Sequence, residues 1–203
     1  MDNPVVDFSE SIPGVFQARQ KRSIRIRDAF ILAGVEALNE KRLAELSVSQ
    51  LASFSGNSVG SFYTRFRDKD AYFRALRAHA IESLDAEINA RFTATILRKL
   101  EPVEALKLLV DLLADIFTSR FRGILRESLL RILEPEDPWA PMRQSAQGII
   151  ATLHSGLDTA FPQFQRKHAR TRLSFCFQMI VGVLQNDLVN DYHVFSTRDH
   201  SIR

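Results

Sequence analysis

Apolar residues recur along most of the chain with the 3.6-residue period of amphipathic helices, and no segment shows the strict alternation of a half-buried strand. In the first such segment, Ile26, Phe30, Ala33 and Ala37 fall on one helical face. The pattern predicts an all-α protein. The expected helices cover residues 19–39, a short segment from 47, residues 58–65, residues 68 into the nineties, a stretch from about 102 to 132 with a bend near Gly123, and residues 140–160 and 167–190.

The segment 47–69 has the pattern of two short helices joined by a tight turn. Ser47, followed three residues later by a glutamine, forms a capping box that satisfies free amides at the start of a helix. Ser58 can cap the next helix in the same way, and Phe62 and Phe66 lie four residues apart on the apolar side of that helix. This arrangement is typical of a helix-turn-helix.

The sequence divides into three parts around this motif. Residues 1–18 are acidic, contain two prolines and show no periodicity, which predicts a flexible arm. Residues 19–67 form the expected helix-turn-helix domain. Residues 68–203 begin with a long helix that contains no glycine or proline, and they form a larger helical domain.

The excess positive charge is confined to the helix-turn-helix segment. Residues 19–80 contain 12 Lys/Arg and 6 Asp/Glu, a net charge of +6, whereas residues 81–203 contain 15 of each sign and residues 1–18 carry −3. Clustered cations attract a polyanion over a long range and release its counterions on binding. Because positive charge is unfavourable at a helix N-terminus, we expect the basic run that opens the first helix to contact phosphates. This run is Arg19, Lys21, Arg22, Arg25 and Arg27.

Other features narrow the class of protein. No apolar run reaches the roughly 20 residues of a membrane span, and the N-terminus lacks the basic and apolar regions of a signal peptide. A cytoplasmic protein without membrane contact is therefore expected. Cys176 lies between two phenylalanines and is expected to be a buried apolar residue. The five histidines never fall at ligand spacing with one another or with Cys176, so no metal site and no cofactor are expected.

The helix-turn-helix segment resembles the DNA-binding motif of the tetracycline-repressor (TetR) family. The resemblance extends from Phe30 to Leu76 and depends on Ser47–Ala52, Ser55–Ser58, Gly60–Tyr63, Phe66 and Lys69. Three positions depart from the family pattern. Arg42 stands where a glycine commonly ends the first helix, and Ser55 and Asn57 replace an alanine and a valine or isoleucine of the turn. Asparagine tolerates left-handed backbone angles and could serve in that turn.

The resemblance implies that the third helix, residues 58–65, enters the major groove, where base edges are distinguishable. Arg65 would bind a guanine or a phosphate, whereas Tyr63, Lys69 and free amides at the start of the second helix would hold the DNA backbone. The expected DNA-binding residues are Ser47, Val48, Ser58, Val59, Gly60, Ser61, Tyr63, Thr64, Arg65 and Lys69.

The resemblance also implies a homodimer, formed through a four-helix bundle with two helices from each subunit, that binds a pseudo-palindromic operator and responds to a small effector. Residues 68–203 would then be the ligand-binding and dimerisation domain. An apolar or amphipathic effector is expected, with a pocket wall of Phe92, Phe117, Phe121, Trp139 and Met142. The expected dimer interface is Ile149, Leu153, Leu157, Phe177, Ile180 and Leu184. For the pocket residues, the alternative is an ordinary apolar core.

The last expected helix carries two apolar stripes. One contains Leu173, Phe177, Ile180, Leu184 and Leu188, and the other contains Cys176, Met179 and Val183. A helix at the edge of a monomer needs only one such stripe. The second stripe, together with Gly182, favours burial against a second copy of the chain as well as against its own domain. A helix wrapped entirely by its own chain is the alternative.

Three classes of function fit these patterns: a ligand-responsive transcriptional repressor, an enzyme, and an all-helical sensor or interaction protein that has lost DNA binding. An enzyme would need a nucleophile with a base, paired carboxylates or a metal site. The acids of the larger domain fall at helical surface spacing, which a solvated helix face explains; they are Glu104, Asp111, Asp115 and Glu127. The charge of the helix-turn-helix segment favours the repressor.

Overall fold

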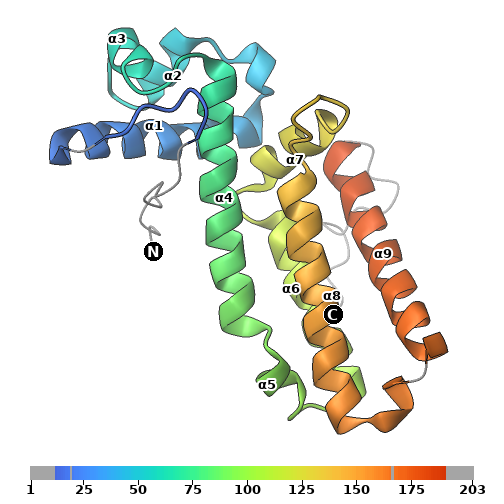
Figure 1. Cartoon of the computed structure of the whole chain (residues 1–203). Helices are drawn as coiled ribbons and strands as arrows, with labels where there is room; N and C mark the ends of the chain where they lie inside the picture. The colour runs from blue at the N-terminus through green and yellow to red at the C-terminus, as the bar shows by residue number, and fades with distance from the viewer. Residues whose placement is uncertain (1–11, 19, 166, 191–203) are drawn as a thin grey trace, which may run out of the picture. The chain divides into compact units, whose positions relative to one another are not determined.

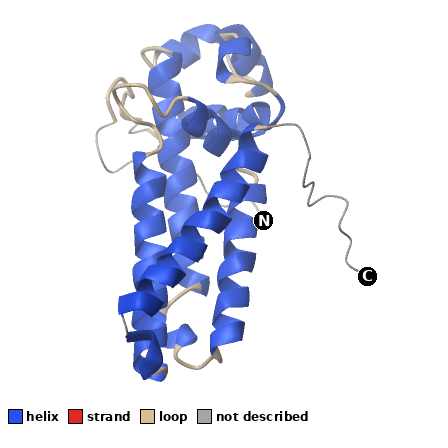
Figure 2. Cartoon of the chain, turned by 90° about the vertical axis from the view of Figure 1, so that its right-hand side faces the viewer, coloured by secondary structure: helices blue, strands red, loops and turns tan. Residues whose placement is uncertain are grey.

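The computed structural model describes residues 12–18, 20–165 and 167–190. Within these ranges every regular element is helical (Figure 1), as Figure 2 also shows, and the prediction of an all-α protein is confirmed. The elements are α1 (Lys21–Glu40), η1 (Leu43–Glu45), α2 (Val48–Phe54), α3 (Val59–Tyr63), α4 (Lys69–Arg91), α5 (Ala94–Leu97), α6 (Pro102–Thr118), α7 (Arg122–Leu130), α8 (Ala140–Ala160), η2 (Pro162–Gln165) and α9 (Lys167–Val189). None of the described helices is both long and apolar enough to span a bilayer.

The chain packs as two units. The first contains the described residues up to Asp85 together with Arg120–Ser128, and the second contains Ala86–Ser119 and the described residues from Leu129 to Asn190. These units differ from the predicted domains 19–67 and 68–203, because most of α4 and the segment 120–128 pack with the helix-turn-helix. The long helix α4 therefore begins in one unit and ends in the other.

The core of the first unit is an aromatic cluster in which α1, α3 and α4 meet. Phe30, Phe62, Phe66 and Tyr72 are fully buried, and the ring of Phe62 lies edge-on to those of Phe30 and Tyr72 at centroid distances of 5.5 and 5.2 Å. The Tyr72 hydroxyl donates to the backbone oxygen of Phe30 at 2.7 Å. Such edge-on packing adds to the area that large rings bury, so this cluster is the platform on which α3 lies.

The buried face of α1 is turned relative to the predicted one. Phe30 and Ala37 are buried as expected, but Ile26 and Ala33 are only half-buried. The buried positions are Arg27, Phe30, Ile31, Gly34, Val35, Ala37 and Leu38. Gly34 explains part of the difference, because a Cβ there would lie 2.0 Å from the Tyr72 hydroxyl. Because Gly34 has no side chain, Tyr72 of α4 can pack directly against α1 at this position. The face of α1 that contains Gly34 is therefore the buried one.

The described part of the predicted arm, residues 12–18, contacts the first unit. Residues 1–11 lie outside the described part of the chain, but residues 12–17 run against the junction of α3 and α4. The amide of Phe16 donates to the oxygen of Arg65 at 2.8 Å, and the amide of Arg67 donates to the oxygen of Gly14 at 2.9 Å. Gly14 has φ +79° and a Cβ there would lie 2.8 Å from the Cβ of Ala71, so glycine is needed at this position. These backbone contacts differ from the flexible arm that composition predicted.

The second unit is a helical bundle in which α5 contacts α8, and α6 and α8 both contact α9. Its core includes Leu109, Leu113, Ile149, Leu153 and Leu157. Three of the predicted helix starts agree with the structure, because Pro102 opens α6 and α8 and α9 begin at Ala140 and Lys167. The bend expected near Gly123 is a full break between α6 and α7.

Candidate nucleic-acid interface

The start of α2 is held by the predicted capping box. The amide of Gln50 donates to the Ser47 hydroxyl at 3.2 Å, and the amide of Ser47 donates to the Gln50 side chain at 2.9 Å. Ser47 is exposed and Val48 is half-buried. Because the capping box uses the amides of Ser47 and Gln50, the amides of Val48 and Ser49, at N1 and N2, are left for an outside acceptor.

The turn between α2 and α3 is built differently from the prediction. Gly56, not Asn57, takes the left-handed conformation, with φ +67°. Asn57 instead folds back on α2: its amide donates to the oxygen of Ala52 at 2.9 Å and its side chain donates to the oxygen of Ser55 at 2.7 Å. An asparagine that bonds to nearby backbone stabilises a turn, so the departures from the family pattern at Ser55 and Asn57 still give a tight turn.

The outer side of α3 is a small exposed surface. Ser58 caps the helix by accepting from the amide of Ser61 at 3.1 Å, and Phe62 anchors the inner side in the aromatic cluster. Val59 is 41% exposed and Tyr63 is 51% exposed. At Gly60 a Cβ would meet nothing closer than the Ser58 hydroxyl at 3.8 Å. Nothing in the fold therefore requires a glycine there, although glycine weakens a helix.

Arg65 does not project from this surface. Its side chain is buried and donates to the oxygen of Ser61 at 2.8 Å, to the hydroxyl of Thr64 at 2.7 Å and to the backbone oxygen of Ser23 at 3.3 Å. Burial lowers the pKa of its guanidinium. These bonds tie the end of α3 to the start of α1, so Arg65 positions α3, which differs from the expected contact with a guanine or a phosphate.

Lys69 is also engaged within the unit. Its ammonium donates to the backbone oxygens of Leu43 and Leu46, each at 2.9 Å, which holds the segment that leads into α2. Arg42, the other departure from the family pattern, has an extended backbone with φ −76° and needs no glycine. Its side chain forms an ion pair at 2.7 Å with the buried Glu127 of α7.

The basic run of α1 separates into two groups. Arg27 is buried and pairs with Asp28 at 2.8 Å, so it is a core residue and not the predicted phosphate contact. Lys21, Arg22 and Arg25 are exposed. The remaining member, at position 19, lies outside the described residues. Within the described ranges, no group of three His, Cys, Asp or Glu side chains could hold a metal ion.

The second unit contains a cavity of about 90 Å³ that includes part of the predicted pocket wall. Phe117, Trp139 and Met142 line it, with the rings of Phe117 and Trp139 6.5 Å apart. Phe92 is buried but does not line this cavity. Phe121 belongs to the first unit.

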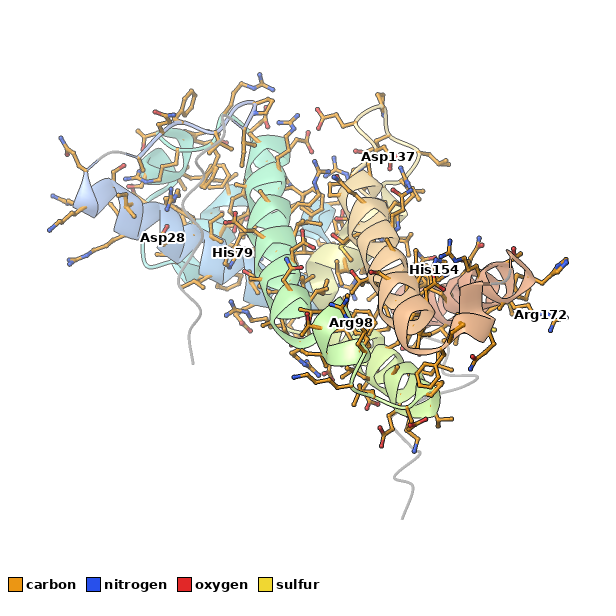
Figure 3. The ribbon with its side chains drawn as sticks, turned by 60° about the horizontal axis from the view of Figure 1, so that its bottom comes forward. Asp28, His79, Arg98, Asp137, His154 and Arg172 are labelled. Atoms are coloured by element: carbon orange, nitrogen blue, oxygen red, sulfur yellow. The ribbon has the colours of Figure 1, made fainter. Side chains whose placement is uncertain are left out.

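There Phe121 lies edge-on to His79 of α4 at 5.5 Å. Figure 3 labels His79 on this helix. Burial, together with nearby arginines, lowers the pKa of His79 to about 4, so both rings are core of the helix-turn-helix unit. Of the five predicted pocket residues, three therefore line one cavity.

The exposed face of α9 is not the predicted dimer interface. Ile149, Leu153, Leu157 and Phe177 are buried within their own unit, as core residues are, and Ile180 and Leu184 are half-buried. The exposed apolar residues of α9 are Phe175, Met179 and Val183, at 62, 55 and 58% exposure. Cys176 is exposed beside them, which corrects the expectation of a buried cysteine, and Gly182 has open space around it.

No family model matches the chain, and no curated protein matches it in sequence. Solved structures similar to it include native NalD, the secondary repressor of the MexAB-OprM multidrug efflux pump of Pseudomonas aeruginosa, at 18% identity and TM-score 0.48 over 82% of this chain and 86% of that chain. A second NalD structure has 18% identity and TM-score 0.41, over 83% and 86%. AlkX, a TetR family repressor from Dietzia sp. strain DQ12-45-1b implicated in biodegradation of n-alkanes, has 15% identity and TM-score 0.40, over 83% and 86%. At TM-scores below 0.5, these likenesses carry no conclusion about what this chain does.

Proposed function

We propose that the chain is a transcriptional repressor of the TetR family, which binds a pseudo-palindromic operator as a homodimer and leaves it when a small apolar effector enters the second unit. The observation that carries this proposal is the exposed outer side of α3. It is a capped helix on a rigid aromatic platform, in the segment of the chain that holds the excess positive charge. An α-helix presented in this way fits the major groove.

The exposed residues suggest how α3 would read DNA. Val59 is suited to contact with a thymine methyl group, and the hydroxyls of Ser61 and Thr64 are suited to polar base edges. The phenol of Tyr63 and the amide of Val48 would hold phosphates, and these contacts would fix the register without reading sequence. Ser47 and Ser58 would contribute as caps, and Arg65 and Lys69 would act by positioning α3 and the start of α2.

The test of DNA binding is selection of fragments from genomic DNA by the full-length protein, followed by titration of the selected fragment at several salt concentrations. We expect a two-fold symmetric site and an affinity that falls steeply with salt, because phosphate contacts release counterions. Val59→Glu, which places a negative charge on α3, should abolish binding, whereas Glu82→Gln on α4 should not. Failure to select any fragment would favour an interaction protein without DNA binding.

Gly60→Ala should have opposite effects on two properties: it should raise the stability of the protein and lower its affinity for DNA. We expect the variant to be more stable by about 0.5–1 kcal/mol, since alanine is the better helix former and its Cβ has room. The same methyl group would lie between α3 and the bases, so the operator affinity should fall by about tenfold or more. Urea unfolding and fluorescence anisotropy with a labelled operator measure the two effects. An unchanged affinity would show that α3 does not approach DNA closely at Gly60.

The effector is proposed to be small, apolar and uncharged. The cavity is lined mainly by apolar side chains, and Arg143 at its edge is already paired with Asp137, which lowers the pKa of that carboxyl. The uncharged polar side chains that line the cavity are Gln185 and Ser145, whose hydroxyl donates to the backbone oxygen of Pro141 at 3.3 Å. An apolar site with two uncharged hydrogen-bonding groups favours a neutral ligand that carries one polar group.

Trp139, the only tryptophan of the chain, should report on this ligand. Because it lines the cavity, small neutral aromatic or branched aliphatic alcohols that bind there should change its emission and release the operator. Ala146→Leu should fill the cavity and remove both responses. Ala151→Leu, on the exposed side of α8, is the matched control and should leave both unchanged. A response that persists in Ala146→Leu would place the effector elsewhere.

A further inference from the structure

The first unit has a groove of about 700 Å³ on the outer side of α1. Its floor is formed by Ala29, Ala33 and Ala37, and its walls include Leu32 and Phe54, which are 37 and 57% exposed. Arg65, which ties α3 to α1, meets α1 at Ser23, before this groove begins. The groove is therefore a separate surface from the outer side of α3.

Charges are arranged along the same face of α1 with opposite signs at its two ends. Glu36 and Glu40 line the groove near the C-terminal end of the helix, and both are exposed and without an ion pair among the described residues. Lys41, which is also exposed, lines the groove beside Glu40, so this end carries a net charge of −1. Arg22 and Arg25 are exposed at the other end; Arg25 is three residues after Arg22 and four before Ala29, which places all three on one face of the helix. Figure 3 shows the side chains that project from α1, with Asp28 labelled.

We propose that a second copy of the chain docks in this groove, with the two α1 helices antiparallel about a two-fold axis. With the axis near residue 31, Arg25 faces the partner's Glu36 and Arg22 faces the partner's Glu40. Two-fold symmetry makes each of these pairs occur twice. The alanine floor lets the helices approach closely, and the exposed ring of Phe54 lines the same groove and could contact an arginine of the partner.

The charge pattern favours this occupant over two others. DNA is excluded from the groove because the carboxylates of Glu36 and Glu40 would repel its phosphates. A parallel arrangement of two copies would place arginine against arginine and glutamate against glutamate. A basic helix of another protein would pair with the glutamates but would leave Arg22 and Arg25 without partners. Of these arrangements, the antiparallel second copy gives both arginines and both glutamates a partner of opposite sign. These pairs extend over about 27 Å of helix, for the 18-residue step from Arg22 to Glu40 at 1.5 Å per residue.

The first test measures self-association in a protein that cannot use the exposed face of α9. In the full-length Met179→Arg, Val183→Arg variant, sedimentation equilibrium at about 50 mM salt should show a reversible monomer–dimer equilibrium that weakens at about 500 mM salt, since exposed ion pairs are screened. A variant that remains monomeric at all concentrations and at low salt would overturn the proposal, whatever the fate of DNA binding.

The second test reverses the charges within that variant. Glu36→Arg with Glu40→Arg should weaken association by about tenfold or more, and so should Arg22→Glu with Arg25→Glu, because each makes the face uniform in sign. An equimolar mixture of the two should associate again. The matched control is Glu82→Arg with Asp111→Arg, two exposed acids on other helices, which should leave association unchanged. Unchanged association in either reversal, or no recovery in the mixture, would overturn the proposal.

Discussion

Gly123→Ala is expected to destabilise the first unit by about 3 kcal/mol, at the upper end of the cost of overpacking a well-packed site. A Cβ at this position would lie 2.1 Å from the backbone oxygen of Leu38 and 2.5 Å from the amide nitrogen of Asn39. Both atoms belong to the backbone of α1. No side-chain rotation can relieve the clash, so either α1 or the start of α7 must move.

The surrounding hydrogen bonds oppose such a movement. The side chain of Asn39 donates to the oxygen of Arg120 at 2.9 Å and accepts from the amide of Gly123 at 2.8 Å. Arg126 donates to the oxygen of Leu38 at 2.8 Å. Together these bonds fix the segment 120–128 on the end of α1, and a shift large enough to admit a methyl group would break several of them.

Urea unfolding followed by circular dichroism measures the effect, with Gly148→Ala as the matched control. Gly148 lies in α8, and a Cβ there would have no atom within 4 Å, so alanine at this position should stabilise by about 0.5–1 kcal/mol through helix propensity. Equal stability of the two variants would contradict the close contact at Gly123. The comparison keeps the chemistry of the substitution constant and changes only the space around it.

Sequence patterns that span a few neighbouring residues correctly predicted where several helices begin. The caps at Ser47 and Ser58 act over three residues, and each accepts the expected backbone amide in the structure. The starts of α8 and α9 followed from the breaks that precede them. Such features depend on neighbours in the chain, which is why spacing alone is enough to find them.

Contacts between distant segments were not predictable in the same way. Arg65 was expected on the DNA because a basic residue at the end of α3 has the same sequence pattern whether it points outward or toward Ser23. The contact of Gly123 with Leu38 joins backbone atoms 85 positions apart, and a glycine near a helix start does not by itself indicate which distant segment lies against it. The backbone hydrogen bonds between residues 12–17 and Arg65 and Arg67 involve no side chains. The spacing of apolar residues along the sequence therefore could not predict them.

The last helix, α9, shows which features the spacing of apolar residues can predict and which it cannot. Both stripes of α9 exist, and the prediction that one faces the chain's own unit is consistent with the burial of Phe177 and Leu188. The predicted interface residues of α9 belong to the more apolar stripe, of which Phe177 is buried and Ile180 and Leu184 are half-buried in the chain's own unit. The exposed stripe of Phe175, Met179 and Val183 is the one left for a partner.

Met179→Arg with Val183→Arg is therefore expected to abolish the proposed dimer and to lower operator affinity by about 10²–10⁴-fold. Two arginines at residues that are 55 and 58% exposed cost little in the monomer, but in a dimer they would be buried without partners. In a dimer, binding of one subunit to its half-site holds the other subunit at a high effective concentration near the second half-site. A monomer loses this advantage as well as the contacts with one half-site, so its operator affinity is much lower. Light scattering measures the mass, and anisotropy with the selected operator measures the affinity.

The control must add the same charge without touching α9. Val103 and Val110 of α6 are 64 and 45% exposed, so Val103→Arg with Val110→Arg makes a variant of identical net charge. It should remain dimeric and bind the operator at least as well as the parent, since added positive charge favours DNA. The mass is measured at about 500 mM salt, where the association proposed for the α1 groove is weakened by screening. A dimer of the α9 variant that survives at this salt concentration would rule out the exposed face of α9 as the interface. A monomer with undiminished operator affinity would instead rule out binding as a two-fold dimer, so the mass and the affinity together decide which part of the proposal fails.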